Sequence, residues 1–327
     1  MRSRRRVASL GAVALAVIGL GSASGFTLAL LTGSATLSAN AFTAAASFDT
    51  VAPTVSASVI AKSGLYFAAF IKQAGVYNVY ANATDGGAVP TGIATIKADV
   101  SLITTGQTAV TLVAGSYTVE GVTYGYRSAN LTANTPLTGS KTYTLTSTDN
   151  NANSRLQTGF PVTVENVVPT ATDIQTANGG TTVGRIELGD TITYTFSEII
   201  DPQSILANWT GASTSVVVRF TNVASTDTYQ VWNSANATVL NLGTVNTKGN
   251  YVTAATTAGV GATPSTMVLN TATNKITITL GTIAGTLATD AANRTAAWTP
   301  VNTAFDRAGN AMSTTLVNET GAADPDF

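Results

Sequence analysis

The carboxylates Glu198 and Asp201 stand three positions apart and are the residues whose types and spacing best suit hydrolytic chemistry. Most glycoside hydrolases use two carboxylates, one on each side of the scissile bond. Such enzymes also need a cleft lined with further carboxylates, and only 17 of the 327 residues are Asp or Glu. A secreted polysaccharide hydrolase therefore remains an alternative, against an interpretation of both residues as parts of a strand end and turn.

Histidine and cysteine are both absent from the sequence. Their absence removes Ser-His-Asp and Cys-His nucleophiles, disulfides and the usual ligands of zinc. We therefore predict no enzymatic activity, no catalytic residues and no organic cofactor. Three aspartates in predicted turns, Asp85, Asp149 and Asp306, are candidates for binding calcium, which takes clustered oxygen ligands. The alternative is that each aspartate caps its own turn.

The charge balance also restricts the partners. Lys and Arg number 16 against 17 for Asp and Glu, and the first six residues hold four of the arginines. A nucleic-acid-binding protein needs a clustered basic surface, so we expect no nucleic-acid partner. Ten Tyr, ten Phe and three Trp argue for a folded chain in spite of the low charge.

The N-terminus has the pattern of an export signal. Arginines precede the apolar run Val7–Leu20, and the small residues Ser22–Ser24 follow it. We predict a signal peptide over 1–24, an extended segment over 25–49, and a location at the cell surface or in the medium. Alternatively, the 25 residues Val7–Leu31 are retained as a membrane anchor, since they are long enough to span a bilayer. Ala322–Phe327 predicts no second anchor.

From residue 50 onward, apolar and polar side chains alternate, which is the pattern of half-buried β-strands. In Asp190–Phe196, Ile192, Tyr194 and Phe196 share one face, with threonines on the other. The same alternation marks five further segments: Tyr77–Ala83, Ala94–Ser101, Lys141–Thr148, Phe160–Val164 and Asn274–Leu280. Short strands between Gly, Asn and Asp turns predict an all-β fold of sandwich type.

The chain repeats one plan twice. Val51-Ala-Pro53-Thr is echoed by Val167-Val-Pro169-Thr, and each copy closes on a turn that begins with aspartate. Pro53 and Asp149 are 96 positions apart, whereas Pro169 and Asp306 are 137 apart. We predict two tandem sandwich domains, over 50–166 and 167–327. The second carries an insertion over about 221–274.

Three regions of the chain, namely the second predicted domain, the first predicted domain and the N-terminal segment, resemble known bacterial proteins. Thr193–Pro202 (TYTFSEIIDP), Asn208-Trp209 and Asp306-Arg-Ala-Gly-Asn310 resemble the immunoglobulin-like domain of S-layer proteins. Val79–Asp85, Gly92-Ile93 and the Asp149 turn resemble a bacterial immunoglobulin-like repeat, with Ala152 in place of the usual glycine. Thr32–Ala44 resembles the start of mature camelysin and TasA-type proteins, some of which form fibres. The resemblance implies two immunoglobulin-like domains of a bacterial surface protein.

Two other functions are favoured over the hydrolase, and the first of them is the leading prediction. The first is a non-enzymatic structural protein, a subunit or spacer of a cell-surface layer or filament. Its partners are other surface subunits or its own copies, with residues 34–48 added to a sheet edge of the next subunit. Its membrane contact is limited to the leader.

The second function is that of an adhesin or carbohydrate-binding module, which binds cell-wall or host glycans through 221–274 and Trp232. Tryptophan in a sandwich is otherwise a core residue, which applies equally to Trp209 and Trp298.

Overall fold

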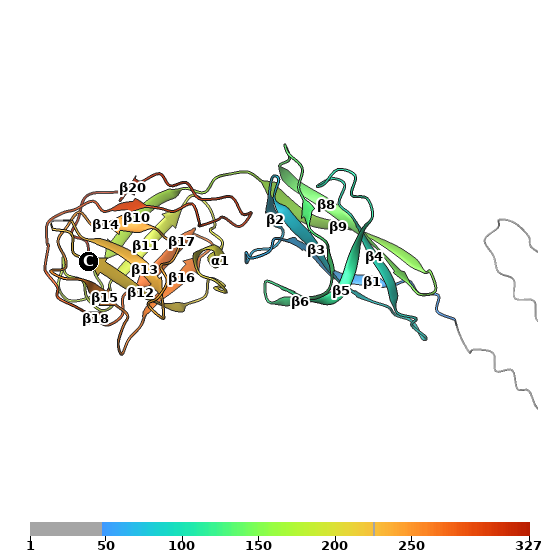
Figure 1. Cartoon of the computed structure of the whole chain (residues 1–327), viewed down its shortest axis with the longest axis horizontal. Helices are drawn as coiled ribbons and strands as arrows, with labels where there is room; N and C mark the ends of the chain where they lie inside the picture. Colours follow the sequence, from blue (N-terminus) through green and yellow to red (C-terminus); the bar gives the residue numbers. More distant parts are fainter. Residues whose placement is uncertain (1–47, 225) are drawn as a thin grey trace, which may run out of the picture. The chain divides into compact units, whose positions relative to one another are not determined.

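The computed structural model of the chain describes residues 48–224 and 226–327 (Figure 1). The predicted signal peptide over 1–24, the alternative anchor to Leu31 and the extended segment up to residue 47 lie outside this part. Within it, no helix is both long and apolar enough to cross a membrane. The described residues belong to one compact unit, which is built from two β-sheets.

The first sheet forms a sandwich of the immunoglobulin type. Its strands follow the order β1-β3-β6-β5-β4-β8-β9-β2, and β7 pairs with β3. The first seven strands of this path correspond to A-B-E-D on one side and C-F-G on the other. The strand bounds are β1 Thr54–Ala61, β2 Phe70–Lys72, β3 Val76–Thr84, β4 Ile93–Asp99, β5 Val110–Val119, β6 Val122–Ser128, β7 Leu131–Thr132, β8 Gly139–Asp149 and β9 Ser154–Glu165.

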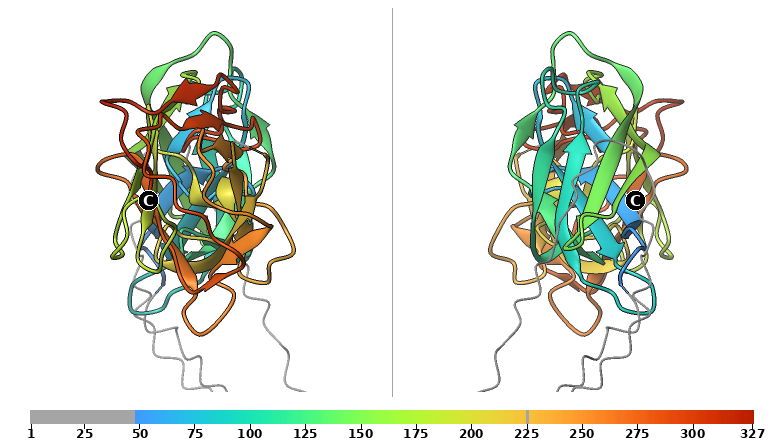
Figure 2. Two further views of the ribbon diagram at one scale, coloured as in Figure 1. Left: turned by 90° about the vertical axis from the view of Figure 1, so that its left-hand side faces the viewer. Right: turned by 90° about the vertical axis from the view of Figure 1, so that its right-hand side faces the viewer.

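The second sheet begins in the same way, with the order β10-β11-β17-β16-β12, and then continues through β13, β14, β19 and β20. Figure 2 allows its strands, coloured from yellow-green to red, to be followed from two further directions. The strand bounds are β10 Ala171–Ala177, β11 Thr191–Phe196, β12 Thr214–Thr221, β13 Thr228–Asn233, β14 Thr244–Asn246, β15 Thr256–Ala258, β16 Ser265–Asn270, β17 Lys275–Thr279, β18 Ile283–Ala284, β19 Ala297–Thr299 and β20 Val317–Asn318.

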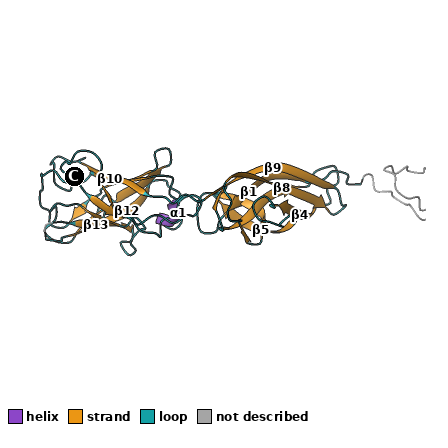
Figure 3. Ribbon diagram, turned by 90° about the horizontal axis from the view of Figure 1, so that it is seen from above, coloured by secondary structure: helices purple, strands orange, loops and turns teal. Residues whose placement is uncertain are grey.

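Alternation of side chains explains these strands. In β11, Ile192, Tyr194 and Phe196 are buried, whereas the threonines between them face outward. Thr193 is directly opposite Thr277 on β17, so the outer face is a ladder of threonines. Each of the six segments predicted from alternation overlaps an observed strand. The prediction of an all-β chain with tandem sandwich domains is confirmed, and α1 (Pro202–Ile205) is the helix that interrupts the strands of the described part (Figure 3).

Each domain has its own apolar core. In the first, Tyr77, Ile96 and Tyr143 are almost wholly buried. In the second, Trp298 packs edge-on against the rings of Tyr194 and Phe196 at 4.9 and 5.2 Å. Trp209 lies in the same core. Trp209 and Trp298 are therefore core residues and not platforms for a sugar.

The segment 221–274 contributes strands to the second sheet and is not one long loop. It contains β13 to β16. In the first domain β4 pairs directly with β8, whereas in the second β13 and β14 lie between β12 and β19. The two domains thus share a plan, and two additional strands widen the second.

Candidate functional site

The aspartate of each closing turn accepts hydrogen bonds from the turn itself. Asp306 Oδ1 accepts the backbone N–H groups of Ala308, Gly309 and Asn310 at 2.8, 2.6 and 2.8 Å. Its Oδ2 accepts the side-chain amide of Asn310 at 2.8 Å. A carboxylate is an acceptor only, so four donors suit it well. Asp306 therefore caps its turn.

Asp149 repeats this arrangement in the first domain. Its Oδ1 accepts the N–H groups of Asn151 and Asn153 at 2.8 Å each, and its Oδ2 accepts the Asn153 amide at 2.7 Å. The fourth residue of each turn has positive φ: 65° at Ala152 and 96° at Gly309. The two turns are built alike although their sequences share only the first and last residues.

Asp149 also belongs to a group of three carboxylates at one end of the first domain. An oxygen from each of Asp49, Asp85 and Asp149 lies within 4.8 Å of the other two. Asp49 stands four positions before Pro53, and Asp85 directly follows β3. One oxygen of Asp85 is buried without a hydrogen-bond partner. We call Asp49, Asp85 and Asp149 the first triad.

Hydrogen bonds hold Asp49 in its ionised form. Its Oδ1 accepts the N–H of Val51 at 3.0 Å, and its Oδ2 accepts the N–H and hydroxyl of Thr91 at 2.9 Å each. The bond from Val51 is the largest influence on the pKa of Asp49, which lies below its usual range. The first triad therefore has a charged member, and Asp85 supplies a free oxygen.

A second triad occupies matching positions around the second domain, although its first member, Glu165, is the last residue of β9 in the first domain. It consists of Glu165, Glu198 and Asp306, again with oxygens within 4.8 Å of one another. Glu165 stands four positions before Pro169, and Glu198 follows β11 by two. One oxygen of Glu165 and one of Glu198 are buried without a partner. Burial, and then the charges of Glu165 and Asp306, raise the pKa of Glu198 to about 7.

The second triad differs from the first because basic side chains surround it. Arg307 lowers the pKa of both Glu165 and Glu198 by its charge, although burial raises both pKa values overall. Its guanidinium lies 3.9 Å from the centre of the Phe70 ring. Lys62 also acts on Glu165 by its charge. The positive charges of Arg307 and Lys62 thus partly balance the carboxylates of the second triad, so this group requires a metal ion less than the first triad does.

The predicted calcium candidates are divided between these groups. The structure brings Asp85 and Asp149 together and places Asp306 in the other triad. Sequence reasoning missed Asp49 and Glu165, although their shared spacing before the repeated proline was a usable signal. Carboxylate oxygens are the ligands that calcium prefers, so the residues of the first triad fit such an ion.

The two carboxylates of the candidate catalytic pair, Glu198 and Asp201, have different partners. Asp201 Oδ2 accepts the N–H groups of Tyr66 and Phe67 at 2.8 and 3.0 Å, and Oδ1 accepts those of Tyr66 and Gln203 at 2.9 and 3.0 Å. Asp201 is fully buried and is the N-cap of α1. Burial raises its pKa, while the bonds from Tyr66 and Phe67 oppose this. Glu198 instead faces the other members of the second triad.

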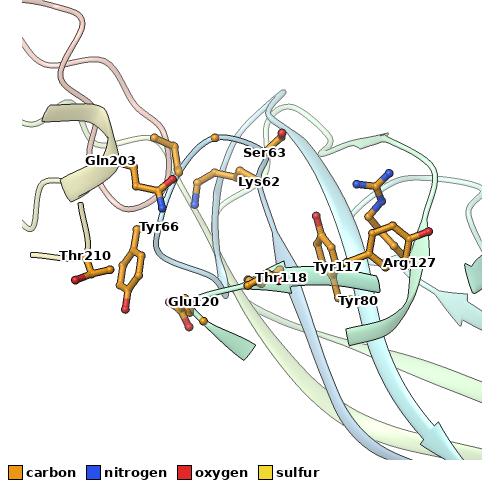
Figure 4. Close-up of a pocket in the computed structure, with 14 residues that line it drawn as sticks. Lys62, Ser63, Tyr66, Tyr80, Tyr117, Thr118, Glu120, Arg127, Gln203 and Thr210 are labelled. Atoms are coloured by element: carbon orange, nitrogen blue, oxygen red, sulfur yellow. The ribbon is translucent and has the colours of Figure 1, made fainter. Parts of the chain in front are cut away.

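A polar and aromatic pocket of about 330 Å³ lies beside the Tyr66 loop. Figure 4 shows the side chains around it. The guanidinium of Arg127 lies 4.5 Å from the centre of the Tyr117 ring, and the Tyr117 ring meets that of Tyr80 edge-on at 6.3 Å. The labelled lining residues are Lys62, Ser63, Tyr66, Tyr80, Tyr117, Thr118, Glu120, Arg127, Gln203 and Thr210. Arg127 thus lies over one face of the Tyr117 ring, and the mixture of polar and aromatic side chains suits a small polar ligand such as a sugar.

Trp232, the residue expected to stack on a sugar, is covered on one face. The guanidinium of Arg219 lies 3.5 Å from the Trp232 ring centre. Arg219 is held there because its Nε–H and Nη2–H donate to the side-chain and backbone oxygens of Asn236. The sequence did not reveal the pocket, because Tyr80, Tyr117 and Arg127 lie on three different strands, β3, β5 and β6.

No protein-family model matches the chain, and no curated protein shows significant similarity to it. Among solved structures, the C-terminal domain of the antigen I/II-family protein AspA of Streptococcus pyogenes aligns over 83% of this chain and 99% of its own. Its sequence identity is 11% and its TM-score is 0.22. The C-terminal domain of the AgI/II polypeptide BspA of Streptococcus agalactiae aligns over 82% and 100%, at 12% identity and a TM-score of 0.20. Likeness at this level assigns no function to the chain.

Proposed function

We propose that this chain is a non-enzymatic, exported structural protein, a subunit or spacer of a cell-surface layer or filament. The observation that carries the proposal is the environment of Asp201. Its carboxylate, the best candidate for chemistry in the sequence, binds backbone N–H groups of the first domain at Tyr66 and Phe67. With that of Gln203 included, three backbone N–H groups occupy both oxygens of this buried carboxylate, so it is a structural element with no oxygen left for a substrate.

Fixed contact between tandem domains is what a spacer requires. Lys62 of the first domain donates a hydrogen bond to the carbonyl oxygen of Arg307 in the second, and Arg307 in turn lies over the Phe70 ring. Domains joined only by a linker move independently. The bonds of Asp201 and Lys62 favour two sandwiches that behave as one body, with other surface subunits or further copies of the chain as partners.

Unfolding measurements on the full chain test this coupling. All three tryptophans lie in the second domain, so their fluorescence reports on it alone, whereas circular dichroism reports on both domains. We expect the two signals to change together in the wild type and to separate in Asp201→Asn, which places an amide donor among N–H donors. Asp99→Asn is the matched control, because Asp99 accepts the N–H of Ser101 within its own domain. Two separate transitions in the wild type would contradict the proposal.

Calcium at the first triad belongs to the same proposal. An ion between Asp49, Asp85 and Asp149 joins the segment before β1 to the ends of β3 and β8, and so stiffens this end of the domain. At a concentration of ~100 times the Kd, one bound ion stabilises a protein by ~2.7 kcal/mol. We expect calcium to raise the Tm of the wild type. Asp85→Asn should lose most of this gain while keeping its Tm in chelator, and an equal gain in both proteins would count against the site.

The pocket supports a second function, the binding of cell-wall or host glycans. It presents the Tyr117 ring next to the charged groups of Arg127 and Glu120. A glycan array distinguishes binding at this pocket from binding at the site expected around Trp232. We expect binding that Tyr117→Ala abolishes and Trp232→Ala retains. If only Trp232→Ala abolishes binding, the glycan site lies in 221–274. If the wild type binds no glycan, this second function is wrong.

A further inference from the structure

A third group of carboxylates lies in the second domain and is separate in sequence from both triads. It consists of Glu319, Asp324 and Asp326, and an oxygen from each lies within 4.8 Å of the other two. Glu319 directly follows β20, and the backbone of Asp324 pairs with that of Arg294. Asp326 is fully buried, Glu319 is 8% exposed and Asp324 is exposed. The group therefore reaches from the surface into the core.

One oxygen of the buried member has no partner. Asp326 Oδ1 accepts the hydroxyl of Thr176 at 2.8 Å, but its Oδ2 is buried without a hydrogen bond. Glu319 Oε2 accepts the N–H of Ala296 at 3.1 Å. A buried carboxylate oxygen without a hydrogen bond or a cation is costly, and such atoms are rare in folded proteins. The fold thus leaves an acceptor at this point that the chain itself does not satisfy.

Tyr251 points to the same place independently. Its side chain is fully buried, and its hydroxyl also lacks a hydrogen-bond partner. Burial raises the pKa of Asp326, and the nearby Tyr251 hydroxyl opposes this shift, although neither that hydroxyl nor Asp326 Oδ2 has a partner at hydrogen-bond geometry. The Tyr251 ring is fixed by the Phe327 ring, whose centre is 5.4 Å away. Two unpartnered oxygens from distant parts of the chain therefore face one small region.

The surroundings add negative charge and little to balance it. Asp173, Asp290 and Asp324 are among the neighbours that act on Glu319 or Asp326 by their charge. Arg294 is the basic residue nearby, and its guanidinium is already bonded to Asp290 at 2.8 Å. A cluster of carboxylates in this setting attracts a cation.

We propose that Glu319, Asp324 and Asp326 bind a divalent cation of the calcium class, with the Tyr251 hydroxyl at the buried side of the site. All donors are oxygen atoms, which hard cations prefer, and calcium accepts an irregular set completed by water. The exposed Asp324 provides the route of entry. The ion joins the end of β20 to the segment 324–327 and to Thr176 on β10. This site depends neither on the first triad nor on the proposed surface role.

Terbium luminescence and calcium titration of the full chain test the site, because terbium bound beside Tyr251 is excited through that ring. The variants are Asp326→Asn and Glu319→Gln. Asp85→Asn, in the first triad, and Asp99→Asn are the controls. We expect both site variants to bind one ion fewer, or the same ion at least about 10-fold more weakly. Both controls should retain this ion, which separates the site from the first triad.

Stability in the absence of metal provides a second readout. Asp326→Asn removes a buried negative charge, so in chelator its Tm should equal or exceed that of the wild type, and calcium should no longer raise it through this site. If Asp326→Asn does not fold, Tyr251→Phe keeps the ring packing and removes one ligand atom, and we expect several-fold weaker binding. Wild-type protein that binds neither ion, or variants that bind as it does, would overturn the proposal.

Discussion

The ammonium group of Lys62 donates a hydrogen bond to the carbonyl oxygen of Arg307, with Nζ and O 2.6 Å apart. The same group donates to the carbonyl oxygens of Phe67 and Phe70 at 2.8 Å each. Burial lowers the pKa of Lys62 to about 8, and the charges of Asp201 and Asp306 oppose this shift. A single cation thus satisfies backbone groups from both domains.

Lys62→Met should destabilise the protein. It leaves three carbonyl oxygens without a donor, and we expect the free energy of unfolding to fall by about 2 kcal/mol at neutral pH. The unfolded state holds the proton up to the ordinary pKa of 10.5, whereas the folded state releases it near 8. Wild-type stability should therefore rise relative to the variant between these two pH values. Urea titrations across this range measure the difference, and parallel curves would refute the assigned pKa.

Asp306→Asn should open the closing turn of the second domain. The amide keeps one acceptor, but its NH₂ group faces the side-chain donor of Asn310. We expect a loss of about 2 kcal/mol in the free energy of unfolding, and the same for Asp149→Asn in the first domain. Asp99→Asn, with a single backbone bond, should cost less than either. Denaturant unfolding of the three variants gives the ranking, and equal losses would show that the turn network adds nothing.

Ala152→Gly should stabilise the first domain. Ala152 has a φ of 65°, which side chains disfavour and glycine accepts freely. We expect a gain of about 0.5 to 1 kcal/mol. The reciprocal change, Gly309→Ala, should cost about 1 kcal/mol, because φ there is 96°, which a residue with a Cβ disfavours. Thermal unfolding measures the Tm of both variants. If both substitutions raise the Tm, or both lower it, the two turns do not share one backbone geometry.

Tyr77→Phe should protect the protein at alkaline pH. Burial raises the pKa of Tyr77 to about 12, although its hydroxyl bonds to that of Thr104 at 2.6 Å. The folded state resists ionisation that the unfolded chain undergoes at 10.0, so stability falls as the pH rises from 10.0 to about 12. The variant should be weaker at neutral pH by about 1 kcal/mol for the lost bond, with a shallower alkaline decline. A decline of equal slope in both proteins would exclude Tyr77 as a cause.

Much of the fold was predictable because its causes are local. The alternation of Ile192, Tyr194 and Phe196 with threonines determines both the strand and its buried face. The Asp149 and Asp306 turns are likewise stabilised within five residues. All-β structure in two tandem domains follows from such segments, and the structure agrees.

The candidate sites depend on contacts that the sequence does not reveal. Asp201 was predicted to lie in a turn, but its partner Tyr66 is 135 positions away, and only the fold brings them together. The first triad joins a segment before β1, the end of β3 and the end of β8, so it requires the sandwich topology. Arg219 covers one face of the Trp232 ring, a contact that the sequence did not reveal, and sugar binding at Trp232 stays a prediction.

The short strand β2 runs parallel to β9, with Phe70 opposite Thr163 and Lys72 opposite Glu165. Backbone bonds from Thr163 to Ala69 and from Gln73 to Glu165 extend this pairing at either side. Tension that pulls the chain before β2 away from the chain after β9 slides the two parallel strands lengthwise. Their cross-links then carry the load together and cannot open one at a time. The parallel pairing of β2 with β9 therefore opposes a lengthwise separation of these two segments.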